Sequence, residues 1–180
     1  MKKVLIITYY WPPKGGVGVQ RWLKLSKYLS KTHYTPVIYT PQGGECNIRD
    51  ISLNDVVPTN IEVIHKNIFE PQSILNFFSR KKTSADILIS QRNSFFYKIL
   101  IWIRANLFIP DTRSLWISPS VHFLDNYLKN NHIDCIISTG PPHSMHMIAL
   151  ELVKKFPNET KKKIAGIMNI SVRTLSRHIK

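Results

Sequence analysis

The sequence has few cysteines, few acidic residues and no long apolar run, and each shortage excludes a class of protein. Its two cysteines, Cys46 and Cys135, lie far apart and match no metal-ligand spacing, which fits a reducing compartment. No stretch of about 18 apolar residues is present, so we expect no membrane-spanning helix. The apolar residues 4–7 are too few for a secretory signal and no cleavage site follows them, so we expect a cytoplasmic protein.

The shortage of acidic residues leaves a strongly basic chain. Its 180 residues include 25 Lys and Arg but only 11 Asp and Glu, which gives a net charge of +14. Residues 1–150 hold 17 basic and nine acidic side chains, whereas residues 151–180 hold eight and two. Such a surplus suits anionic partners, namely sugar nucleotides, acidic lipid or nucleic acid, and charge alone does not select among them. The uneven distribution indicates a separate basic tail over residues 157–180.

The order of apolar runs predicts an α/β fold. Short β-prone runs occupy residues 4–8, 36–40, 61–64 and 134–139, and patterns of helical spacing occupy residues 19–29, 73–79, 95–109, 120–130 and 143–156. Strands that alternate with helices over short links are typical of parallel sheets. We therefore expect residues 1–156 to form a Rossmann-like parallel sheet flanked by helices, followed by a short helical tail.

A glycine-rich loop follows the first predicted strand. Gly15 and Gly16 precede a helix, where backbone amides and the helix dipole favour an anion, and Lys14 and Arg21 add positive charge. The loop lacks the third glycine of a dinucleotide fingerprint, because Arg21 stands in that place. The alternative is a glycine-rich turn that binds no ligand.

A second strand–turn–helix junction covers residues 138–144. Ser138 and Thr139 end the predicted strand and His143 stands near the start of the next helix. In a parallel sheet this junction lies at the same edge as the glycine-rich loop, where open α/β sheets bind ligands. His143 is a candidate general base, and its alternative is a partly exposed residue that caps the helix.

A third motif, residues 110–116, brings an acid, a base and an aromatic into one turn. Asp111 and Arg113 either pair with each other or contact a ligand, and Trp116 either stacks on a sugar or packs in the core. Residues 95–109 are aromatic with interleaved cations, which suits an interfacial helix on an anionic membrane or a core helix whose cations reach solvent.

These three motifs resemble bacterial family 4 glycosyltransferases of the GT-B fold, over residues 1–156. The resemblance lies in residues 3–21, 109–116 and 138–144. It implies a retaining transfer of a sugar from a nucleotide-sugar donor to a glycan or lipid-linked acceptor, with no metal at the diphosphate and no other cofactor. It also implies that this half mainly holds the acceptor, at a peripheral position on the membrane. The donor-binding half of the family does not follow, so we expect the chain to be inactive alone.

Roles for individual residues also follow from the resemblance. It implies a catalytic role for His143 and a donor-phosphate site at Gly15 and Gly16. The predicted donor-phosphate residues are Lys14, Gly15, Gly16 and Arg21, and the predicted acceptor or sugar contacts are Trp11, Asp111, Arg113, Trp116, Ser138 and Thr139.

The basic tail suggests an alternative function. Residues 161–180 resemble a helix-turn-helix, with Ala165, Asn169 and Leu175 at its small, turn and packing positions. Ser171 suits the cap of a second helix that presents Arg173 and further cations to DNA. The alternative to the transferase is thus a DNA-binding protein that acts through this tail.

Overall fold

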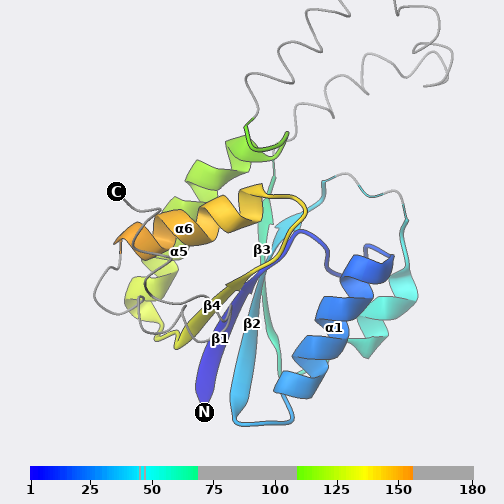
Figure 1. Ribbon diagram of the computed structural model, residues 1–180. Coiled ribbons are helices and arrows are strands. Elements are labelled where there is room, and N and C mark those ends of the chain that lie inside the picture. Colours follow the sequence, from blue (N-terminus) through cyan, green and yellow to red (C-terminus); the bar gives the residue numbers. More distant parts are fainter. Residues whose placement is uncertain (45, 47, 69–108, 156–180) are drawn as a thin grey trace, which may run out of the picture.

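The computed structural model describes residues 1–44, 46, 48–68 and 109–155, which form an α/β arrangement with an all-parallel sheet (Figure 1). The strands are β1 (Lys2–Ile7), β2 (Tyr34–Gln42), β3 (Glu62–Asn67) and β4 (Cys135–Ser138), in the order β3-β2-β1-β4. The helices are α1 (Val17–Leu29), α5 (Ile117–Asn130) and α6 (Ser144–Lys155), with short 3-10 helices η1 (Ile51–Val56) and η2 (Ser114–Trp116). All three pairings are parallel, with Ile6 opposite both Ile38 and Ile137.

Helices cover both faces of the sheet. α1 and η1 lie on one face, and α5 and α6 lie on the other (Figure 1). Alternate residues of β1 serve the two faces, as strand geometry requires. Leu5 and Ile7 belong to the core cluster with α5 and α6, whereas Val4 and Ile6 belong to the cluster with α1. Burial on both faces explains why the strand is a continuous apolar run.

The predicted strands and three of the predicted helices are confirmed, with ends that differ by a few residues. Residues 4–8, 36–40, 61–64 and 134–139 correspond to β1 to β4, and residues 19–29, 120–130 and 143–156 correspond to α1, α5 and α6. The helices predicted over residues 73–79 and 95–109, and the tail over residues 157–180, lie outside the described residues. The helix η1 was not predicted.

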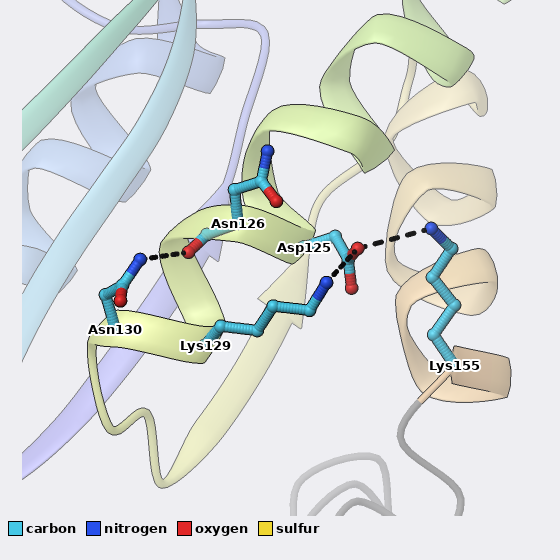
Figure 2. A network of polar contacts seen from close by, with 5 residues as sticks. All are labelled: Asp125, Asn126, Lys129, Asn130 and Lys155. Atoms are coloured by element: carbon cyan, nitrogen blue, oxygen red, sulfur yellow. Dashed lines mark hydrogen bonds and ion pairs between the residues drawn. The ribbon is translucent and has the colours of Figure 1, made fainter.

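Charged side chains connect the two helices of one face. Asp125 of α5 lies 3.1 Å from Lys129 and 3.5 Å from Lys155 of α6 (Figure 2). The hydrogen bond from Lys129, aided by the charges of both lysines, lowers the pKa of the Asp125 carboxyl in spite of its partial desolvation. The Lys155 contact joins α6 to α5, whereas the Lys129 contact lies within α5. None of the helices described here is long and apolar enough to cross a membrane.

Candidate functional site

The carboxyl ends of β1 and β4 meet at one edge of the sheet. Thr8 directly follows β1 and Thr139 directly follows β4. The Thr139 hydroxyl donates to the Thr8 hydroxyl at 3.2 Å, and the Thr139 amide donates to the Ile7 carbonyl at 3.1 Å. Both threonines are buried. The glycine-rich loop and the junction at residues 138–144 therefore start from adjacent points, as the parallel topology predicts.

The third motif reaches the same edge through Asp111. Its Oδ2 accepts a hydrogen bond from the Ser144 amide at 2.8 Å, and its Oδ1 accepts from the Ser144 hydroxyl at 2.8 Å. Oδ1 also accepts from the Arg113 amide at 2.8 Å. A carboxylate at the first residue of α6 satisfies a free amide and complements the helix dipole. These hydrogen bonds of Asp111 attach the loop of residues 110–116 to the start of α6.

Tyr9 is the contact point of the first and third motifs. Lys14 Nζ donates to the Tyr9 carbonyl at 3.1 Å and lies 3.6 Å from the centroid of the Tyr9 ring. The Arg113 guanidinium lies 4.9 Å from the same centroid, and its Nη2 is 3.5 Å from the Tyr9 hydroxyl. Tyr9 is 1% exposed and Lys14 is 7% exposed. Lys14 and Arg113 therefore make cation–π contacts with a buried aromatic ring.

The two glycines of the first loop have different roles. The Gly15 amide donates to the Ile48 carbonyl at 2.7 Å, and a Cβ at Gly15 would lie 2.7 Å from Ile48 Cγ2. Gly15 therefore packs against residues 48–50, and its amide is used within the protein. Gly16 has a φ of 101°, precedes α1 and has open space where a Cβ would stand. Arg21 lies exposed on α1 beyond it. Of the two glycines, Gly16 is the one with open space beside its Cα.

Both tryptophans that were predicted to contact the acceptor or sugar are core residues in this structure. Trp11 is 3% exposed and packs with Leu23 and Ile38 beneath α1. Trp116 is 1% exposed and stacks on Tyr39, with ring centroids 5.2 Å apart and ring planes at 13°. The Trp116 ring is covered by the core, whereas Trp11, although almost fully buried, forms part of the wall of a cavity beside the glycine-rich loop. For Trp116, the core position is one of the two alternatives that the sequence left open.

A serine–histidine pair lies at the end of β4. Ser138 Oγ is 2.9 Å from Nδ1 of His146, and the rings of His146 and His143 are 6.0 Å apart. Burial, and then the positive charge of His143, lower the pKa of His146. His146 is therefore a neutral imidazole near pH 7 and can accept a proton. A Cβ at Gly140 would lie 2.5 Å from His146 Nε2, so glycine is what lets this ring approach the turn.

His143, the residue predicted to be catalytic, has an exposed ring beside the buried start of α6. The sequence leaves His146 with the same alternatives as His143, a functional role or a partly exposed position near the helix start. Its contact with Ser138, eight residues away across the turn, comes from the structure.

A cavity of about 310 Å³ opens beside the glycine-rich loop. Its polar lining includes Lys14, Arg49 and His65, and Gly43 and Gly44 form part of its wall. Arg49 is brought there because residues 14 and 49 form an antiparallel bridge between the two loops. Burial lowers the pKa of His65. Arg49 and His65 were not predicted as site residues, since no motif marks them.

Within the described ranges, no group of three or more His, Cys, Asp or Glu side chains is placed to bind one metal ion. The aromatic segment at residues 95–108 and the helix-turn-helix-like tail lie outside those ranges, so their suggested contacts with membrane and DNA stay predictions. Comparison of the chain with protein-family models, with curated proteins and with solved structures gives no match.

Proposed function

We propose that this chain supplies the acceptor-side half of a glycosyltransferase, which moves a sugar from a nucleotide-sugar donor to a glycan or lipid-linked acceptor. The observation that supports it is the meeting of three sequence motifs at the carboxyl edge of one parallel sheet. Thr8 contacts Thr139, Tyr9 contacts Arg113, and Asp111 holds Ser144. In open α/β sheets this edge is where ligands bind.

The donor diphosphate is assigned to the start of α1. The structure leaves Gly16 open there, no side chain caps the helix within the described residues, and Arg21 is exposed nearby. An uncapped helix start attracts an anion through its amides and its dipole. Because the Gly15 amide donates to Ile48, Gly16 replaces Gly15 as the main backbone contact in this proposal.

The acceptor hydroxyl is assigned to the end of β4. His146 is kept neutral and is hydrogen-bonded to Ser138, so it is better placed than His143 to take up the proton of an acceptor hydroxyl. His143 lies beside His146, and its charge lowers the pKa of His146. A lipid-linked acceptor would bring the chain to a membrane surface as a peripheral protein.

The proposal is tested by titration of the full 180-residue chain, followed by NMR. The donor probes are UDP-glucose, UDP-N-acetylglucosamine and GDP-mannose, and the acceptor probe is a sugar linked to a short-chain polyprenyl diphosphate. We expect at least one donor and the acceptor to bind, with resonances of residues 14–18 shifted by the donor and those of residues 138–146 shifted by the acceptor. If neither class of probe shifts these resonances at millimolar concentration, the proposal fails.

A matched pair of variants locates the donor. Gly16→Ala closes the open approach to α1, whereas Gly43→Ala adds a methyl group at another positive-φ glycine, at the end of β2. Donor affinity is expected to fall about tenfold or more in Gly16→Ala only, which is the cost of one lost charge-assisted hydrogen bond. Equal losses in both variants would contradict the placement at α1.

A further inference from the structure

The exposed face of α1 is basic and contains no acidic residue. Arg21, Lys24 and Lys27 lie on the helix, Lys31 follows it, and no Asp or Glu occurs in the first 44 residues of the chain. Lys24 and Lys27 are three residues apart on the helix, and Lys31 follows it on the same side, so that the three lysines form one stripe. All three lysines are exposed. Like charges at this spacing repel one another, so the stripe is destabilising unless an anion lies against it.

The lysines of the other helical layer are arranged differently. Lys129 and Lys155 contact Asp125 (Figure 2). Lys154 contacts Glu151 at 2.6 Å. Among the residues that the structure describes, the lysines of the α1 stripe have no ion pair. Among the described residues, the two helical layers therefore differ in how their positive charge is balanced: the lysines named on α5 and α6 are in ion pairs, and those of the α1 stripe are exposed without one.

A groove of about 560 Å³ lies between α1 and η1, directly beside the stripe. Lys24, Lys27 and Lys31 line it from α1, while its apolar lining includes Leu23 and Leu53. The arrangement is amphipathic: cations stand along one side of an apolar channel that opens to solvent.

Large apolar side chains are exposed on the same two elements. Val17 is 77% exposed, Tyr28 is 68% exposed and Ile51 is 73% exposed. Val56, which also lines the groove, is 44% exposed. Exposed apolar residues interleaved with lysines are typical of surfaces that lie in the interface of an acidic bilayer, where apolar groups enter the boundary and lysines contact lipid phosphates. A nucleic acid would use the lysines but leave the apolar side chains unused.

We propose that the face formed by α1 and η1 docks onto a bilayer of anionic phospholipid, with Lys24, Lys27 and Lys31 on the headgroups and Tyr28 in the interface. This inference goes beyond the proposed sugar transfer and does not rest on it. The contact differs from the one that the sequence suggested over residues 95–109, since it uses α1, a helix near the N-terminus that the structure describes.

The test is co-sedimentation of the full chain with vesicles of phosphatidylcholine that contain 0 or 30% phosphatidylglycerol, a range on the order of natural acidic surfaces. The α1 variant carries Lys24→Gln, Lys27→Gln and Lys31→Gln. The matched control carries Lys129→Gln, Lys154→Gln and Lys155→Gln, which remove the same charge from the other layer. Both variants keep residues 69–108 and the basic tail, so any binding by those segments is common to them.

We expect the α1 variant to bind the anionic vesicles about a hundredfold more weakly than the wild type, and the control to bind nearly as well. Tyr28→Ser tests the apolar part: it should weaken binding about fivefold, while Tyr34→Ser, at the start of β2, should not. Circular dichroism spectra and melting temperatures that match the wild type would show that each variant is folded, because glutamine and lysine have similar helix propensity.

Three outcomes overturn the proposal. One is an equal loss of vesicle binding in the α1 variant and its control, which would make the attraction a matter of net charge alone. The other is an α1 variant that binds vesicles like the wild type but loses affinity for a duplex DNA probe, which would make nucleic acid the partner of this face. The third is a wild type whose vesicle binding does not depend on the phosphatidylglycerol content.

Discussion

Asp111 and Ser144, 33 residues apart in the sequence, are joined by two hydrogen bonds of 2.8 Å each. One comes from the backbone amide at the first residue of α6 and the other from the buried Ser144 hydroxyl. The carboxylate therefore caps the helix from outside, and it also fixes the turn that leads into η2 and Trp116. A motif that resembles a ligand-binding segment thus has a structural task in this fold.

We predict that Asp111→Ala lowers the free energy of unfolding by about 2 kcal/mol, because the helix loses its cap and the buried Ser144 hydroxyl loses its acceptor. Urea denaturation followed by circular dichroism measures the change. The control is Asp55→Ala, which removes an exposed carboxylate from η1 and should change stability by less than about 0.5 kcal/mol. Similar losses in the two variants would mean that Asp111 contributes charge and not a cap.

Much of the sheet was predictable because its strands are buried on both faces. Val4 to Ile7 form an uninterrupted apolar run, and such runs can be recognised without knowledge of the neighbours. The helix η1 was missed because it is six residues long and has no buried residue. Its only signal is local: the Asp50 side chain accepts a hydrogen bond from the Ser52 amide, a turn-forming contact that many loops share.

The meeting of the three motifs was predictable from the parallel topology, but the contacts within them were not. Whether Trp116 faces a ligand or Tyr39 depends on packing between η2 and β2, which no local pattern encodes. The same holds for Gly15, whose partner Ile48 lies in a loop more than thirty residues away. Sequence spacing identifies which residues reach an edge, whereas tertiary contacts decide which of them remain open there.

Gly43 and Gly44 form a matched pair for a second prediction. Both have positive φ values, 79° and 83°, so alanine is strained at either position. A Cβ at Gly43 would meet nothing within 4 Å, whereas a Cβ at Gly44 would lie 2.7 Å from the hydroxyl of Tyr9, which is 1% exposed. We expect Gly43→Ala to lower the free energy of unfolding by about 1 kcal/mol and Gly44→Ala by about 3 kcal/mol. If urea denaturation gives the same loss of unfolding free energy for both variants, the Tyr9 side chain can move away from the added methyl group without loss of stability, which would contradict the prediction.

Trp116 gives a third prediction, which separates a core role from a sugar-binding role. Its ring stacks on Tyr39, where burial raises the pKa of the phenol to about 12. Trp116→Ala should lower the free energy of unfolding by about 4 kcal/mol, as for other large core truncations. Leu115→Ala, at a neighbouring side chain that is 48% exposed, is the control and should cost less than about 1 kcal/mol. A stable Trp116→Ala protein that binds the acceptor probe poorly would favour the sugar-stacking role.

The fourth prediction concerns acid sensitivity at the end of β4. Burial and the charge of His143 lower the pKa of His146 below its ordinary value of 6.5. The unfolded chain therefore takes up a proton at a higher pH than the folded chain, and stability falls as the pH decreases from 6.5 through the folded pKa. His65 acts with the same sign, because burial lowers its pKa too. We expect the free energy of unfolding to fall between pH 7.5 and about 5.

Substitutions assign this loss to His146. The pH-dependent fall should be smaller in His146→Gln, which has no group to protonate at this position. NMR titration gives a direct check: His143→Gln should raise the pKa of His146, because it removes the positive charge that opposes protonation. The pKa should still stay below 6.5, since burial is the larger cause and remains in the variant. A His146 pKa that does not respond to His143→Gln would contradict the coupling of the two rings across 6.0 Å.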